Sequence, residues 1–444
     1  MNLEIKILIP NNNVFERLYI IETIFHDFIG INHIVELVDE IDEYHLLFEN
    51  KRIIVKDSFW CFHKEINSYL DINNLPNVHY VKNQFILEEN IPVLYGDGGI
   101  DILENEIYCD IDFFAGSFFM LTRWEEYVNK ERDNHDRFPA YASNANNHNY
   151  LNRPVVNEYI EMLWNMFLHL GYKGERKKRS FEIILTHDID ILKSSNTFRS
   201  LLGDIIKRKS LSLALHNLFS FFYDPVNSFN FLMDVSERIG VKSRFFFMSV
   251  HPETITNNPK NYLKSLRFNS LIKEIIKRGH VIGFHPGYFT YMDNEQWLKE
   301  KSILEDAIGF KVNEGRQHYL KLDITETLNI WDYNGMNIDY SLGYADKEGY
   351  RCGTGDSFYI FDFIRRKKLQ LKETPLVLMD GSLTTYQSLD AEVGREIIEK
   401  YLNLGKKYRM KTVLLFHNSS FDRKNWKGWK SMYENVLIKY KSEN

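Results

Sequence analysis

The sequence predicts an α/β protein whose first part is a mixed α/β region and whose larger second part is built on parallel strands. Beyond residue 180, short apolar runs alternate with helix-like stretches, a pattern typical of a mostly parallel sheet or barrel with helices outside. At 444 residues the chain is too long for one ordinary domain. The apolar pattern breaks at residues 171–180, where Gly174 and a basic stretch interrupt it. We therefore predict an N-terminal mixed α/β domain over residues 1–175 and a second domain over residues 180–444.

Alternating and helical periodicities define the elements of the first domain. The stretch that contains Arg123 and Glu126 predicts a helix with a charged face, and the polar residues 129–149 predict a long loop. The glycines at 96–99 form a turn without the spacing of a phosphate-binding loop. The expected elements, in order, are a strand at 3–9, a helix at 14–28, strands at 53–55 and 78–81, and helices at 117–127 and 156–170.

The second domain alternates strands and helices to the end of the chain. Gly240 stops one of its helices, and the strands are short apolar runs followed by polar residues. The expected elements are strands at 181–185, 244–248, 281–284, 336–338, 376–379 and 412–416, with helices at 228–239, 271–277, 296–308, 324–333 and 393–404.

Composition excludes several classes of protein. Hydrophobic residues at 44% and charged residues at 26% are typical of a folded soluble chain. A net charge of −6 gives no reason to expect nucleic acid or an anionic membrane as partner. The three cysteines, Cys61, Cys109 and Cys352, lack the spacing of a disulfide framework or a thiolate zinc site. The N-terminus lacks the pattern of a signal peptide, and no apolar run approaches the roughly 20 residues of a membrane span. We expect a cytoplasmic protein.

Two carboxylates, Asp188 and Asp190, stand two residues apart where the strand predicted at 181–185 ends. The C-terminal ends of parallel strands open onto the ligand crevice, where one carboxylate can hold a metal ion while its neighbour takes a proton. The alternative is that an aspartate caps a helix or closes an Asx turn. The run from Thr186 to Asp190 leaves both interpretations open.

Four further polar clusters follow predicted strands. Each has a structural explanation by itself, but polar groups at five strand ends of one α/β unit favour a shared active site. The clusters are His285 with Pro286 and Gly287, Arg316 with His318 and Tyr319, Asp339 with Ser341, and His417 with Asn418.

The order of these motifs resembles that of the polysaccharide deacetylases of carbohydrate esterase family 4, the NodB-homology domain. The matching segments are Thr186 to Asp190, Gly279 to His285, Arg316 to Tyr319, and Leu415 to His417. The resemblance covers roughly residues 181–444 and is closest to a bacterial branch with an extra N-terminal domain. It implies a distorted (β/α) barrel for the second domain and no function for the first.

The resemblance also implies catalytic roles. Asp188 is expected to be the general base, Arg316 the group that orients it, and His417 the general acid. The backbone N–H of Tyr319 is expected to stabilise the oxyanion. Asp339 is grouped with Tyr319 among the expected substrate and oxyanion residues; it either raises the pKa of His417 or caps the turn after residue 339, and we favour the turn.

A single divalent metal ion is the expected cofactor, with zinc as the first choice and cobalt, nickel or manganese as alternatives. The resemblance implies Asp190 and His285 as ligands. The family has a second histidine four residues after the first, and here that position is Phe289, which cannot bind metal. We predict that His318, where the family has a proline, supplies the third ligand. Two other histidines are alternatives, His187 and His280.

The predicted function is metal-dependent removal of an N-acetyl or other N-acyl group from an amino sugar of a surface polysaccharide or its cytoplasmic precursor. The alternatives are a catalytically silent protein of the same fold that binds glycans or acts as a scaffold, and an amidohydrolase acting on a non-sugar C–N bond. The expected partner is therefore a carbohydrate. Loops at 351–354 and 380–382 are compatible with a substrate rim and carry no further assignment. The near-helical spacing of Trp426, Trp429 and Tyr433 favours the core over sugar stacking.

Overall fold

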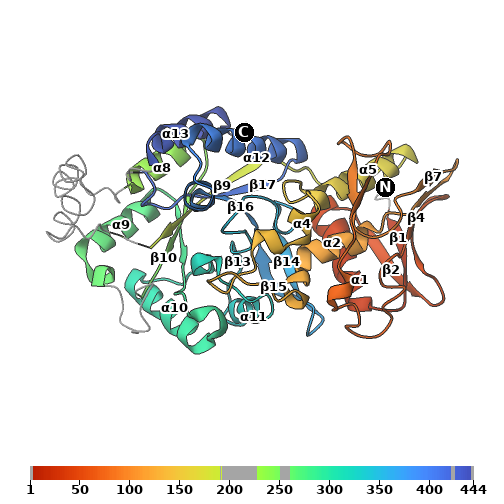
Figure 1. Cartoon of the computed structure of the whole chain (residues 1–444), viewed down its shortest axis with the longest axis horizontal. Coiled ribbons are helices and arrows are strands. Elements are labelled where there is room, and N and C mark those ends of the chain that lie inside the picture. The colour runs from red at the N-terminus through yellow and green to blue at the C-terminus, as the bar shows by residue number, and fades with distance from the viewer. Residues whose placement is uncertain (1–3, 191, 193–227, 251–260, 422–425, 442–444) are drawn as a thin grey trace.

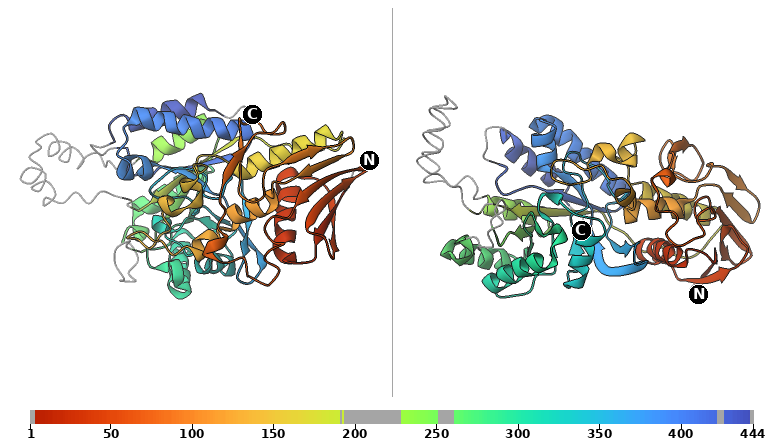
Figure 2. Two further views of the ribbon diagram at one scale, coloured as in Figure 1. Left: turned by 45° about the vertical axis from the view of Figure 1, so that its right-hand side comes forward. Right: turned by 60° about the horizontal axis from the view of Figure 1, so that its bottom comes forward.

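Two large β-sheets organise the part of the chain that the structure describes, one in each part of the sequence (Figure 1). The structure is a computed structural model, and it describes residues 4–190, 192, 228–250, 261–421 and 426–441. The N-terminal elements, red to yellow, lie at one end of the molecule in all views, and the later elements lie beside them (Figures 1 and 2). No helix within the described ranges is both long and apolar enough to cross a membrane.

The first sheet, as far as the structure describes it, has six strands in the order β2-β1-β3-β4-β8-β7. Helices follow the last strands of this region, and all ten residues of α2 are buried. The strands are β1 Ile5–Pro10, β2 His33–Val38, β3 Glu43–Phe48, β4 Lys51–Lys56, β7 Ile100–Ile102 and β8 Glu106–Cys109, and β5 His79–Val81 pairs with β6 Ile91–Val93 in a separate hairpin. The helices are α1 Val14–Ile21 with a π-helical continuation Glu22–Ile29, α2 Phe113–Thr122, α3 Glu125–Val128, α4 Asn144–Asn147 and α5 Val155–His169.

The second sheet has nine strands in the described residues, in the order β14-β15-β13-β12-β11-β10-β9-β17-β16. It is curled and carries its helices on the outside (Figure 1). The strands are β9 Glu182–Ile189, β10 Arg244–Phe247, β11 Val281–Phe284, β12 Glu314–Gly315, β13 Ile338–Asp339, β14 Phe358–Asp362, β15 Lys367–Glu373, β16 Leu376–Met379 and β17 Lys411–Leu415. The helices are α8 Phe229–Arg238, α9 Leu266–Lys277, α10 Asn294–Ile308, α11 Glu326–Tyr333, α12 Ala391–Tyr408 and α13 Trp429–Lys439.

The predicted α/β class with a mostly parallel second sheet is confirmed. Every recorded pairing in that sheet is parallel except the β14–β15 hairpin, which the sequence analysis did not include. The order of strands starts at β14 and ends at β16, so the described strands form an open, curled sheet. The division into domains at residues 175–180 stays a prediction.

The helix predicted at 117–127 is wrong in two respects. Arg123 adopts a left-handed conformation, with φ 55°, and separates α2 from α3. The expected charged face is buried, because Arg123 pairs with Glu125 and Glu126 at 2.9 and 2.8 Å. Glu126 also binds Arg351 of the second region at 2.5 Å, so Arg351 is a buried partner and does not lie on a substrate rim.

Aromatic packing joins the two regions into one hydrophobic cluster. The ring of Phe361 on β14 lies 4.8 Å from Tyr19 on α1 and 5.6 Å from Phe118 on α2. The Tyr19 hydroxyl donates a hydrogen bond of 2.8 Å to the carbonyl of Tyr359. The helices of the first region therefore cover the edge strand of the second sheet, which would otherwise expose unpaired backbone groups.

Candidate metal and catalytic site

Strand β9 lies between β10 and β17 and carries both carboxylates of the first motif. The strand continues to Ile189, four residues beyond the predicted end. Successive side chains of a strand point to opposite faces, so Thr186 and Asp188 share the face opposite to His187. Asp190 follows the last residue of the strand. Because of this alternation, His187 points away from Asp188, although the two residues are neighbours in the sequence.

The other predicted site residues leave neighbouring parallel strands at the same edge. Phe247 pairs with both Ile189 and Phe284, which brings the ends of β10, β9 and β11 into register. His285 follows β11 directly, and His417 lies two residues after β17. Parallel strands place such residues around one crevice.

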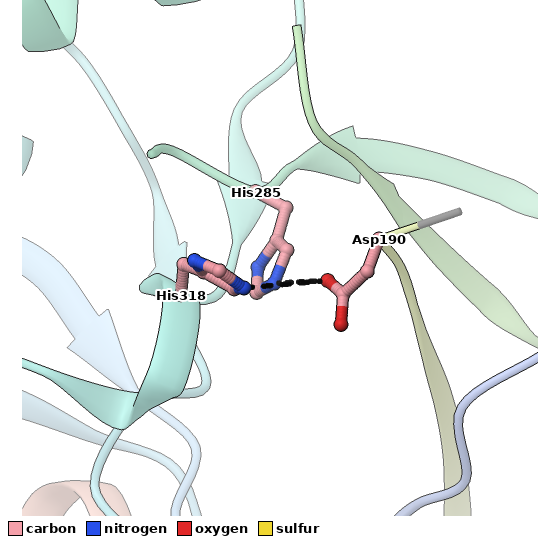
Figure 3. Close-up of side chains that lie close together, drawn as sticks. All are labelled: Asp190, His285 and His318. Atoms are coloured by element: carbon pink, nitrogen blue, oxygen red, sulfur yellow. Dashed lines mark ion pairs between the residues drawn. The ribbon is translucent and has the colours of Figure 1, made fainter. Parts of the chain in front are cut away.

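Asp190, His285 and His318 form the candidate metal site (Figure 3). One ligand atom from each of them lies within 4.8 Å of the others. The Asp190 Oδ1 atom is 3.3 Å from His285 Nε2 and 3.6 Å from His318 Nε2. Figure 3 shows the two rings converging on the carboxylate from separate segments. The structure thus brings the three sequence-predicted ligands together.

The donor set suits a divalent transition metal. Two imidazole nitrogens and one carboxylate oxygen are a normal three-ligand set for catalytic zinc, which leaves a position open for water. His285 Nδ1 lies 2.7 Å from the carbonyl of Arg316, so Nδ1 carries a proton and Nε2 is the ring nitrogen that faces Asp190. Hydrogen bonding from His285 and the charges of His318 and His417 outweigh the opposing effect of burial and hold the pKa of Asp190 well below its usual range. These residues fit a metal ion.

Asp188 and Arg316 form a buried ion pair beside that cluster. Arg316 Nη1 is 2.9 Å from Asp188 Oδ1, and Nη2 donates to the hydroxyl of Thr186 at the same distance. Nε donates to the carbonyl of Tyr340, so three different nitrogens of the guanidinium group are held. The second carboxylate oxygen of Asp188 lies 3.8 Å from His285 Nε2. Asp188 is therefore fixed in direction and points its other oxygen at the candidate metal site.

His417 is paired with Asp380, a residue that the sequence analysis left in a loop without a role. His417 Nδ1 lies 2.8 Å from Asp380 Oδ1, and the backbone N–H of His417 donates to Oδ2 at 2.7 Å. Burial alone lowers the pKa of His417, but the charge and hydrogen bond of Asp380, with the charges of Asp190 and Asp188, raise it to about 10. Asp380 directly follows β16, and β16 pairs with β17, the strand that precedes His417. An aspartate at a predicted strand end was therefore the signal that could have identified the partner of His417.

Asp339, assigned to the substrate region, lies elsewhere. It is buried, accepts a hydrogen bond of 2.5 Å from Ser341, and interacts with the buried carboxyl group of Glu373. Burial raises its pKa to about 6. Asp339 is not among the described residues that line the site cavity. The carboxylate that contacts His417 is Asp380, and Asp339 serves the turn after β13.

The two alternative ligands also have other partners. His187 Nδ1 contacts the carbonyl of Phe416 at 2.7 Å, and Nε2 contacts the hydroxyl of Ser243 at 3.1 Å. His280 Nδ1 accepts the backbone N–H of Ser243 at 3.0 Å. Both rings belong to the packing outside the candidate metal site.

A cavity of about 290 Å³ opens onto the candidate metal site. Aromatic side chains line it beside the polar groups, and Trp426, which the sequence favoured as a core residue, is one of them. Tyr319 is 44% exposed, so its ring is available at the cavity. Arg137, from the first region of the chain, also lines the cavity, and the sequence analysis did not identify it. The remaining lining residues include Asp188, Asp190, His285, His318, Asp380, Tyr386 and His417.

Comparison with known families gives one match, to a family of unknown function, DUF7033, over residues 5–171. The comparison with curated proteins gives no match.

Several solved structures are distantly similar. A candidate polysaccharide deacetylase from Mycobacterium smegmatis is 15% identical, with a TM-score of 0.39, over 59% of this chain and 85% of that one. A carbohydrate esterase family 4 pseudoenzyme from Bacillus anthracis is 12% identical, with a TM-score of 0.32, over 59% and 61%. A family 4 carbohydrate esterase from Streptomyces lividans, solved with acetate, is 10% identical, with a TM-score of 0.29, over 59% and 90%.

Proposed function

We propose that the protein is a metal-dependent hydrolase that removes an N-acetyl or other N-acyl group from an amino sugar of a surface polysaccharide or of its precursor. One observation carries the proposal. Asp188, which is held by Arg316, faces the same cavity as the cluster of Asp190, His285 and His318. His417, which is held by Asp380, faces that cavity too. Amide hydrolysis needs these groups: a base for water, an acid for the amine, and a centre of positive charge.

Asp188 is suited to take a proton from the attacking water. Its ion pair with Arg316 keeps the carboxylate aligned, and its second oxygen faces the cluster. A divalent ion held by Asp190, His285 and His318 would polarise the acyl carbonyl and lower the pKa of water beside it. The backbone N–H of Tyr319, next to His318, is the proposed donor to the oxygen that gains negative charge.

His417 is suited to protonate the departing amine. An amine leaves an acyl carbon readily only after it has gained a proton, so the acid must be protonated at neutral pH. The Asp380 carboxylate favours that state, and the raised pKa of His417, about 10, reflects it. The pairing leaves Nε2 as the ring nitrogen that can reach a substrate.

The size and lining of the cavity support a sugar substrate. About 290 Å³ is at the small end of ligand pockets and suits one pyranose ring with its acyl group. The exposed residues Tyr319 and Tyr386 and the largely buried Trp426 line it, and aromatic rings pack well against the apolar faces of sugars. Asp and His side chains that line the same cavity can accept hydrogen bonds from, and donate them to, hydroxyl groups.

The test combines metal analysis with acetate release from a panel of N-acetylated amino sugars and non-sugar amides. We expect about one zinc per chain in the wild type, and loss of both zinc and acetate release in Asp190→Ala, His285→Ala and His318→Ala. Asp188→Asn should keep zinc and lose hydrolysis. His280→Ala is the control, since His280 lies outside the site and should retain zinc.

Each other outcome has a definite meaning. Zinc binding without hydrolysis of any substrate would reject the enzyme function in favour of a catalytically silent glycan-binding protein. Hydrolysis of non-sugar amides alone would retain the chemistry and reject the amino sugar. Retention of zinc in His318→Ala would show that this histidine is not the third ligand.

A further inference from the structure

The loop at residues 133–137 carries Arg137 from the first region into the wall of the cavity. Arg137 Nη1 donates to the backbone carbonyl of Tyr319 at 3.0 Å, and Nη2 donates to the hydroxyl of Tyr386 at 2.9 Å. Its Nε donates to Asp133 Oδ2 at 2.8 Å, within the same loop. One side chain therefore holds two walls of the cavity and is itself fixed by an aspartate.

Two neighbours of Arg137 extend the contact. His135 Nδ1 lies 3.2 Å from the hydroxyl of Tyr288, and the hydroxyl of Tyr291 donates to Asp136 at 2.6 Å. Tyr288 and Tyr291 belong to the segment that follows His285. The ring of His135 is also 4.8 Å from the ring of Tyr319. The loop at 133–137 thus contacts the segments after both metal-ligand histidines.

The turn that carries His318 needs external support. Tyr319 and Leu320 have φ values of 62° and 54°, and two consecutive side-chain-bearing residues in the left-handed region are unfavourable. Such a conformation persists only where surrounding contacts hold it. The turn makes its own hydrogen bond from Leu320 N–H to the Gln317 carbonyl at 3.0 Å. Arg137 supplies the contact from the first region to the carbonyl of Tyr319, one residue after the ligand.

We propose that Arg137 is a positioning residue that holds the His318–Tyr319 turn in its ligating conformation, so the N-terminal region completes the metal site of the second region. The inference rests on the metal site of the proposed function. Arg137 acts through the turn, because its recorded contacts are with Asp133, Tyr319 and Tyr386 and not with Asp190, His285 or His318. This gives a role to the N-terminal region, for which the sequence offered none.

The experiment measures the zinc dissociation constant of the full chain by chelator competition. Partners that hold metal ligands in place typically contribute 10–100-fold to metal affinity, so Arg137→Ala should weaken zinc binding by about tenfold or more. Arg137→Lys keeps the charge but not the fork of donors, and it should give an intermediate value. If Arg137→Ala does not fold, the lysine variant decides, and affinity equal to wild type would overturn the proposal.

Arg153→Ala is the matched control. Arg153 also lies in the N-terminal region, pairs with an acidic residue, Glu158, donates to a backbone carbonyl, that of Asn90, and lies over the ring of Tyr80. It lines a different cavity. It should lower thermal stability as Arg137→Ala does but leave zinc affinity unchanged. Equal zinc affinities in the two variants would overturn the proposal, since a general loss of stability would then account for both.

Activity is measured in the same samples to separate the two proposals. Tight zinc binding by the wild type without acetate release would reject the deacetylase function. The ratio of the zinc dissociation constants of Arg137→Ala and the wild type would still decide the positioning role. Absence of zinc from the wild type overturns both. With activity present, we expect Arg137→Ala at saturating zinc to raise KM as well, because Arg137 holds Tyr386 in the cavity wall.

Discussion

Replacing Asp380 with asparagine should lower the pKa of His417. Asp380 contacts both the imidazole and the backbone N–H of His417, and its carboxyl group is buried. An adjacent opposite charge shifts a pKa by about 1–3 units. The variant should therefore bring the pKa of His417 down by about that amount from its value of about 10.

The same shift predicts a pH-dependent loss of stability. The folded pKa of His417 lies above the unfolded value of 6.5, so its stabilisation is fully present below pH 6.5 and is lost as pH rises toward about 10. At about 1.4 kcal/mol per unit, a shift of about 1–3 units corresponds to roughly 1.4–4 kcal/mol. Asp380→Asn should therefore destabilise the protein most below pH 6.5 and progressively less up to pH 10.

The assay is an NMR titration of labelled histidine rings in the metal-free protein, with urea unfolding across the same pH range. Asp390→Asn is the control, because Asp390 caps α12 at the surface and asparagine caps a helix equally well. If His417 titrates with the same midpoint in Asp380→Asn and in wild type, the assigned pairing is refuted. In the active enzyme the alkaline limb of the pH–rate profile should move to lower pH, since a general acid must be protonated.

Three further substitutions test the structure. Arg316→Met should leave Asp188 buried without its cation and lower stability in urea unfolding by about 3–5 kcal/mol. Arg351→Met should lower stability by less than the about 3–5 kcal/mol of an unpaired buried charge, because Glu126 keeps Arg123 as a partner at the contact between the regions. Burial lowers the pKa of His187 to about 4, so wild-type stability should rise with pH between about 4 and 6.5 by up to about 3 kcal/mol. His187→Asn should remove that slope.

The control for the arginine variants is a substitution in an exposed ion pair. Arg395→Met removes an ion pair from the exposed face of α12 and should change stability far less than Arg351→Met. Equal losses in those two variants would contradict the assigned burial. An unchanged pH slope in His187→Asn would show that another group causes the acid sensitivity.

Local patterns predicted β1 and β4 of the six-stranded sheet and most of the helices and parallel strands of the second region. The helix predicted at 393–404 lies within α12, and the strand predicted at 281–284 is β11, because periodicity reports which face is buried. The prediction ended strand β9 too early because Thr186 and Asp188 are polar residues within the strand. A search for apolar runs stops at such residues, although they belong to the strand and to the site. The β14–β15 hairpin was missed although residues 367–373 alternate in burial, a signal that was present in the sequence.

The residues alone identify the chemical groups that are available and their order along the chain: carboxylates, imidazoles and arginine after successive strands. The sequence left the third ligand open among three histidines, and it offered Asp339 in place of Asp380 as the possible partner of His417. The tertiary structure decided these points because they depend on pleat and register. Alternation along β9 turns His187 away from Asp188, and the pairing of β16 with β17 brings Asp380 to His417. Only the packing of one region on the other brings Arg137 to the turn after His318, since no local pattern encodes a contact between segments so far apart in the sequence.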